Sequence, residues 1–187
     1  MVSLAALWLP ILLSAVFVFI VSSIIHMAIP IHKGDYKKMD GEDAIREVMR
    51  GQNLTPGQYM MPAAHSMKEV ATPEMAAKFK EGPVGYLTIV PNGQPSMGKA
   101  LILWFLYCLL IGLFSGYMAT ICLSAGAHYM DVFRVVGTAA ILGYALGHCH
   151  ESIWKGLKWS ITIKFIIDGV IYALVTAGTF GWLWPAA

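Results

Sequence analysis

The sequence predicts an all-α integral membrane protein, a four-helix transmembrane bundle with a small α+β cytoplasmic insert between the first and second helices. Of the 187 residues, 57% are hydrophobic and only 13% are charged, and the mean hydropathy is +0.63. A soluble domain usually carries about 25% charged residues, so this composition excludes an ordinary soluble domain. The charges are also unevenly placed, because residues 32–99 hold 17 of the chain's 24 charged residues (13 Lys and Arg, 11 Asp and Glu). Four apolar runs occupy most of the remaining chain.

These four apolar runs are candidate transmembrane helices. They cover roughly Leu4–Ile29, Ala100–Leu123, Val132–Cys149 and Ser160–Trp184. The third run is the shortest and only just crosses about 30 Å of hydrocarbon. The first run has no basic residue before it and is longer than the apolar core of a signal peptide, so we expect a retained helix. The chain therefore divides into a first helix (1–31), a polar insert (32–99) and three further helices (100–187).

The insert carries start and stop signals for short helices and strands. Residues 41–50 are predicted to be helical, with Asp40 as the candidate N-cap. A second helix is expected to begin at Pro73, because proline is favoured in the first helical turn. Residues 58–61 and 84–90 are predicted strands. The insert is thus expected to be a small α+β module.

Lysines near the helix ends predict the orientation of the bundle. Six of them flank the insert and the loop between the third and fourth helices: Lys33, Lys37, Lys38, Lys99, Lys155 and Lys158. On the opposite side, Arg134 is the only Lys or Arg near a helix end. Cytoplasmic loops of membrane proteins carry an excess of Lys and Arg. We therefore expect a cytoplasmic insert, with both termini outside.

The order of these segments resembles that of small multi-span membrane proteins of bacteria. The resemblance covers one helix, an insert ending in Gly82-Pro-Val-Gly-Tyr-Leu-Thr, and three helices ending in Thr-Phe-Gly-Trp-Leu-Trp-Pro185. It implies the bacterial inner (cytoplasmic) membrane as the location. No activity and no site residue are carried over from it.

Polar residues recur at spacings of three and four along the fourth predicted helix, which places them on one face. They are Lys164, Asp168, Tyr172, Thr176 and Thr179. Asp168 lies about 12 Å from the start of the helix, at 1.5 Å per residue. A carboxylate inside a membrane is costly unless it is paired or protonated, so such residues are candidate functional sites. One interpretation is an ion pair between Lys164 and Asp168, one turn apart. The other is a proton or cation site formed by Lys164, Asp168, Tyr172 and Thr176.

Histidines form a second candidate site. The first helix ends near His26 and His32, and the third ends at His148, His150 and Glu151, on the same expected side of the membrane. Imidazoles and a carboxylate at one membrane level could bind a metal ion, a haem or a quinone headgroup. They could equally be interfacial histidines that hydrogen-bond to lipid headgroups or helix ends. No HExxH or CxxC motif is present, so no cofactor is predicted.

Small residues spaced four apart lie on three of the predicted helices. They are Gly112 and Gly116 on the second, Gly143 and Gly147 on the third, and Gly169, Ala173, Ala177 and Gly181 on the fourth. Such residues allow helices to approach closely in membranes. We expect them to pack the bundle or to join copies of the chain.

The sequence contains no catalytic motif, so we do not expect an enzyme. A net charge of +2 and the lack of a Lys/Arg-rich block give no indication of nucleic-acid binding. The leading hypothesis is an accessory or scaffolding subunit of a larger membrane complex, respiratory or photosynthetic for example. Its partners would be the lipid bilayer and other membrane subunits, or a second copy of the chain. The alternatives are a small proton- or cation-translocating transporter or channel that uses Asp168, and a haem-, metal- or quinone-binding protein.

Overall fold

Four long helices dominate the structure, a computed structural model that describes residues 2–187. The helices are α1 (Trp8–Ala28), α5 (Met97–Cys122), α6 (Tyr129–Tyr144) and α8 (Trp159–Trp182). A 3-10 turn (Leu4–Leu7) precedes α1. Four helical stretches are long and apolar enough to cross a membrane: Leu4–Ala28, Met97–Cys122, Tyr129–Lys155 and Trp159–Trp182. Their number, length and apolar character confirm the four helices predicted from the sequence. Four apolar helices of this length suggest a multi-pass membrane protein.

The third span is longer than the sequence predicts. The helical path begins at Tyr129 and passes a break at Ala145 (φ −110°, ψ −57°). It then continues through a 3-10 turn (Leu146–His148) into α7 (Cys149–Lys155). The predicted end at Cys149 followed the end of the apolar run, but a helical backbone does not have to stop where its side chains become polar. The hydroxyls of Ser152 and Thr162, both buried and 2.5 Å apart, join α7 to α8.

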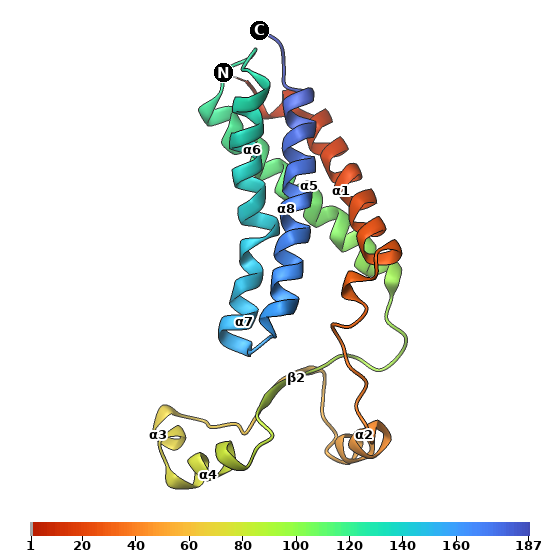
Figure 1. Ribbon diagram of the computed structural model, residues 1–187, viewed down its shortest axis with the longest axis vertical. Coiled ribbons are helices and arrows are strands. Elements are labelled where there is room, and N and C mark those ends of the chain that lie inside the picture. Colours follow the sequence, from red (N-terminus) through yellow and green to blue (C-terminus); the bar gives the residue numbers. More distant parts are fainter. Residues whose placement is uncertain (1) are drawn as a thin grey trace. The chain divides into compact units, whose positions relative to one another are not determined.

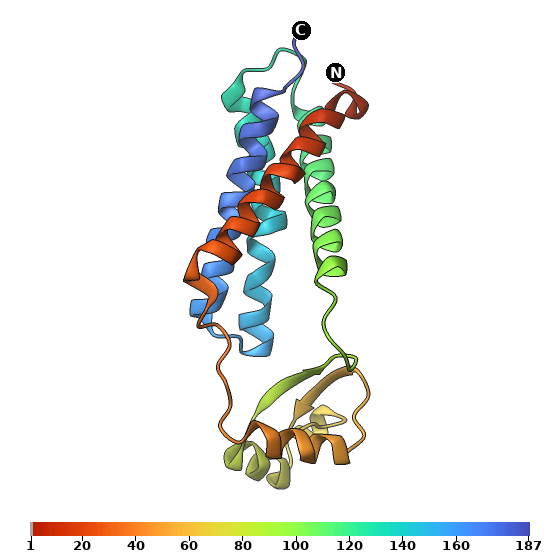
Figure 2. The ribbon, with the colours of Figure 1, turned by 90° about the vertical axis from the view of Figure 1, so that its right-hand side faces the viewer.

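The helices form a closed ring in the order α1, α5, α6 and α8, in which each helix packs against its two neighbours. Figures 1 and 2 show that the start of α1 and the end of α8 lie at the same end of this bundle. We call the opposite end, where α1 ends and α5 and α8 begin, the insert end. In Figure 2, α1 crosses the bundle obliquely, between α5 and α8. The Trp104 indole donates a hydrogen bond to the Ser22 hydroxyl (2.9 Å) and so joins α5 to α1.

Small residues of α8 contact α6 inside this chain. A Cβ atom added to Gly169 would lie 2.5 Å from the carbonyl oxygen of Tyr144. Ala173 and Ala177 have no exposed surface. A Cβ atom on Gly181 would lie 2.7 Å from the ring of Tyr129. The backbones of α6 and α8 can approach this closely because these positions lack larger side chains.

The glycines predicted to pack on the second and third helices are placed less uniformly. Gly112 faces α1, where an added Cβ would lie 3.2 Å from the Ser14 hydroxyl. Gly116 faces the Phe180 ring at 3.0 Å by the same measure, and Gly143 faces the side chain of Ile111. Gly147 lies beyond the end of α6, in the 3-10 turn (Leu146–His148), and is exposed, with open space where a Cβ would be. Three of these four glycines therefore contact other helices of the bundle.

The insert forms a separate unit that comprises Tyr36–Pro95 and Trp154–Gly156. Its elements are α2 (Glu42–Gly51), β1 (Gly57–Met61), α3 (Met67–Val70), α4 (Pro73–Glu81) and β2 (Gly85–Ile89). The two strands pair antiparallel, with Gly57 opposite Ile89. The predicted N-cap at Asp40 is wrong, because Gly41 occupies that position with φ +73°. Glycine takes this left-handed conformation without a steric penalty.

Candidate functional site

One imidazole joins two buried carboxylates at the insert end of the bundle. The Nδ1 atom of His32 lies 2.6 Å from Oδ2 of Asp35, and its Nε2 atom lies 2.8 Å from Oδ2 of Asp168. Both carboxylate side chains are only 4% exposed, and the His32 side chain is 16% exposed. Buried charges of this kind need close polar partners. His32 supplies one to each carboxylate.

Lys164 extends this network on the side of Asp35. Its ammonium donates hydrogen bonds to Oδ1 of Asp35 (2.5 Å) and to the carbonyl oxygen of Ile31 (2.7 Å). The hydrogen bond from Lys164 is the largest influence on Asp35 and lowers the pKa of its carboxyl, while burial acts in the opposite direction and His32 adds to the lowering. The structure thus pairs Lys164 with Asp35 and Asp168 with His32, rather than Lys164 with Asp168.

A short turn after α1 brings His32 and Asp35 to this place. Ile29 is extended (φ −100°, ψ 120°) and ends α1, as expected for a residue that precedes proline. A 3-10 turn (Pro30–His32) follows, and the amide of Asp35 donates to the carbonyl of His32 at 3.1 Å. The turn therefore folds back so that two side chains three residues apart face the same partner helix, α8.

His26 completes a cluster of possible metal ligands. It lies in the last turn of α1, and its ring meets the His32 ring edge-on, with 4.8 Å between the centroids. One ligand atom from each of His26, His32 and Asp168 lies within 4.8 Å of the other two. A pocket of about 460 Å³ opens beside the two histidines. Its lining residues are His26, Met27, Ala28, Ile29, Pro30, His32 and Lys33. The cluster is therefore open to solutes on the His26 side and closed at Asp168.

The other predicted histidines lie outside this cluster. The ring of Phe165 stacks against both His32 (5.1 Å) and His148 (5.2 Å), so an aromatic side chain lies between the two imidazoles. His150 is exposed on α7, and Glu151 is half-buried on the same helix. Of the five residues expected at one membrane level, the structure brings only His26 and His32 together and adds Asp168, which the sequence assigned to a separate site.

The polar face of α8 continues toward the interior of the bundle. Tyr172, Thr176 and Thr179 are all buried. The hydroxyl of Thr176 donates to the Tyr172 carbonyl (2.9 Å), and that of Thr179 donates to the Val175 carbonyl (2.8 Å). Within residues 2–187, the Tyr172 hydroxyl is buried and has no hydrogen-bond partner. It lies on the same face as Asp168, one turn further into the bundle.

Asp35 is the residue of this network that the sequence analysis missed. By composition it belongs to the polar insert, where charged residues are common and a single carboxylate does not stand out as a candidate site. The available signal was its spacing from His32, because residues three apart in a turn or helix can face the same side. That signal is weak, since the pairing also requires the turn to fold against α8.

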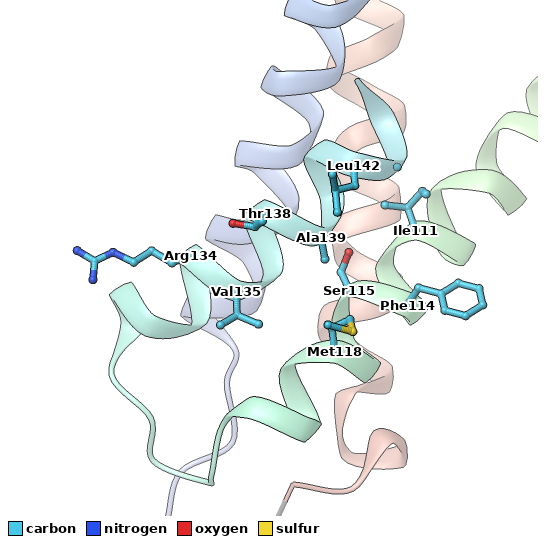
Figure 3. Close-up of a pocket in the computed structure, with 10 residues that line it drawn as sticks. Ile111, Phe114, Ser115, Met118, Arg134, Val135, Thr138, Ala139 and Leu142 are labelled. Carbon is cyan, nitrogen blue, oxygen red and sulfur yellow. The ribbon is translucent and has the colours of Figure 1, made fainter. Parts of the chain in front are cut away.

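A second pocket, of about 560 Å³, lies between α5 and α6 (Figure 3). Most of its lining side chains are apolar, among them Ile111, Phe114 and Leu142. Figure 3 shows the Arg134 side chain extending away from the other labelled residues. The pocket is thus lined mainly by apolar side chains, and Arg134 is the one ionisable residue among the described residues that line it.

Comparison with known protein families, curated proteins and solved structures gives no match to this chain. The chemistry of the site is therefore the basis for assigning a function. Two imidazoles and one carboxylate are cation ligands, and the second carboxylate, Asp35, orients one of the imidazoles.

Proposed function

We propose that this protein is a small cation-translocating membrane protein and that Asp168 is the carboxylate that binds the cation. The observation that carries this proposal is the contact between Asp168, which is 3% exposed on α8, and the His32 imidazole at 2.8 Å. An ionisable side chain inside a membrane-spanning helix is expensive and is commonly part of an ion or proton pathway. His32 gives this carboxylate a polar connection to the pocket at the insert end.

Further polar groups support a path beyond Asp168. The Tyr172 hydroxyl, which has no partner among residues 2–187, lies one turn deeper on α8. Its ring packs among those of Trp104 (5.7 Å) and Tyr144 (5.8 Å) in the middle of the bundle. A buried hydroxyl without a partner is unfavourable unless something else hydrogen-bonds to it. A passing proton or hydrated cation would provide that partner.

Flux into proteoliposomes tests the proposal. Vesicles that contain the purified protein would be loaded with a pH-sensitive dye, or with a dye that reports divalent metal ions. We expect flux well above that of protein-free vesicles and a loss of at least tenfold in Asp168→Asn. The matched control is Asp131→Asn, the same change at an exposed position in the first turn of α6, which should leave flux unchanged. Flux no higher than in empty vesicles, or equal flux in wild type and Asp168→Asn, would contradict the proposal.

The accessory-subunit hypothesis is a second candidate, and the apolar pocket between α5 and α6 favours it (Figure 3). A partner helix or a lipid chain would fit such a surface. The small residues that first suggested this role already pack against helices of the same chain, Gly169 against Tyr144 for example. Gentle extraction followed by native mass spectrometry tests this candidate. Recovery of the chain only as a monomer would count against it.

A further inference from the structure

We propose that the cation is a divalent late transition-metal ion such as Zn²⁺, Co²⁺ or Fe²⁺, bound by His26, His32 and Asp168. This inference deepens the proposed function and rests on it for the transport step, because it names the class of cation held at Asp168.

The ligand set favours these metals over Mg²⁺ or Ca²⁺. Imidazole nitrogen suits zinc, iron, copper and nickel, whereas magnesium and calcium prefer sites built from oxygen alone. Two histidines and one carboxylate also leave coordination positions open for water, as in metal sites that exchange ligands. One ligand atom from each of the three side chains already lies within 4.8 Å of the other two. A site that must release its ion does not need all of its ligand atoms at coordination distance before the ion binds.

Asp35 holds His32 in the orientation that a metal ligand needs. Histidine ligands in metalloproteins usually donate their second ring N–H to a carboxylate, which fixes the tautomer and the ring. Here the Nδ1 atom of His32 lies 2.6 Å from the Asp35 carboxylate, which is itself ion-paired with Lys164. The Lys164 ammonium keeps this carboxylate an acceptor, so Nδ1 carries the hydrogen. The Nε2 atom, which faces Asp168, is then the one that would bind the metal, and the ion would take the place of the hydrogen that lies between Nε2 and Oδ2 of Asp168.

Only a small movement would admit the ion. Ligand atoms at 2.0–2.1 Å from a tetrahedral zinc lie about 3.3 Å from one another, and the Nε2 atom of His32 is 2.8 Å from Oδ2 of Asp168. The two atoms therefore need to separate by about half an ångström. His26 is exposed at the end of α1 and lines the pocket through which an ion would arrive. Its side chain has room to turn toward the other two ligands.

The same network could also serve merely to hold the turn after α1 against α8. In that case the hydrogen bonds of His32 with Asp35 and Asp168 would be sufficient, and His26 would have no role. His26 meets His32 through a ring contact, and its replacement breaks none of those hydrogen bonds. Changing His26 therefore separates a metal site from a purely structural ion pair.

The experiment uses the full-length protein in detergent, first treated with a chelator and then titrated with Co²⁺. We expect a visible absorption band that saturates at one Co²⁺ per chain and disappears when Zn²⁺, which binds such sites more tightly, is added. His26→Ala should weaken Co²⁺ binding by at least tenfold with no loss of thermal stability. Asp35→Asn should weaken it by about 10–100-fold, as is usual for a residue that orients a ligand. His150→Ala, at an exposed histidine of α7, is the matched control and should bind Co²⁺ like wild type.

The absence of a Co²⁺ band, or equal binding by wild type and His26→Ala, would overturn the inference. So would proton flux in vesicles from a protein that shows no metal binding, although the proposed function would then stand. If Co²⁺ binds as expected but vesicles pass no ion, the metal site stands and translocation is wrong. The Co²⁺ titration therefore tests the metal site, and the flux assay separately tests translocation.

Discussion

The Nε2 atom of His32 lies 2.8 Å from the Asp168 carboxylate, although 136 residues separate the two in the chain. The contact joins the turn after α1 to the interior of α8. It turns two separate groups of polar residues, the histidines and the polar face of α8, into one site. Three consequences of the surrounding structure can be measured without reference to transport.

Lys164→Met should loosen the turn that carries His32 and Asp35. The substitution removes the hydrogen bonds that the ammonium donates to Asp35 and to the carbonyl of Ile31. Because the lysine is partly exposed, the effect is expected to be modest, roughly fivefold faster amide hydrogen exchange in residues 29–35. Hydrogen exchange read by mass spectrometry would detect this. Lys158→Met, at an exposed lysine beside the start of α8, is the control, and equal exchange in both variants would show that the network does not hold the turn.

Gly169→Ala should force α6 and α8 apart. The added methyl group would lie 2.5 Å from the Tyr144 carbonyl oxygen and 2.7 Å from the Cα atom of Ala145, and backbone cannot move aside as a flexible side chain can. Overpacking of this kind destabilises a protein by about 2 kcal/mol. Thermal or denaturant unfolding in detergent would measure it. Gly147→Ala, where the methyl group meets open space, should change the free energy of unfolding by less than about 0.5 kcal/mol. Similar losses in both variants would show that the close approach of α6 and α8 does not limit stability.

Tyr172→Phe should leave the free energy of unfolding unchanged or raise it by up to about 1 kcal/mol, because it removes a buried hydroxyl that has no partner in residues 2–187. Tyr107→Phe is the same chemical change, but its hydroxyl donates to the Gly143 carbonyl at 2.7 Å. That variant should lose about 0.6 kcal/mol, the average for hydrogen bonds between membrane helices. Unfolding of the two variants in the same detergent makes the comparison. A loss in Tyr172→Phe as large as in Tyr107→Phe would mean that a bound water or ion engages the Tyr172 hydroxyl.

The four long apolar helices could be predicted from the sequence because hydropathy is a local property. An apolar run such as 100–123 specifies a helix whatever its neighbours do, since every backbone polar group must be satisfied within the helix itself. The polar face from Lys164 to Thr179 could also be predicted, because helical periodicity depends only on spacing along the chain. Its residues from Asp168 onward are buried in the structure. The end of the third span at Lys155 was missed because hydropathy marks where side chains become polar and not where a helical backbone stops.

The pairing of the ionisable groups was decided by the tertiary structure alone. Helical spacing placed Lys164 and Asp168 one turn apart and made an ion pair between them plausible. Their actual partners, Asp35 and His32, come from a turn whose direction depends on Pro30 and on the way α1 packs against α8. Electrostatic energy depends on distance in space, and no periodicity in the chain encodes the distance between two groups more than a hundred residues apart. The sequence therefore identified Asp168 as a residue that needs a partner, and the packing of α1 on α8 determined that the partner is His32.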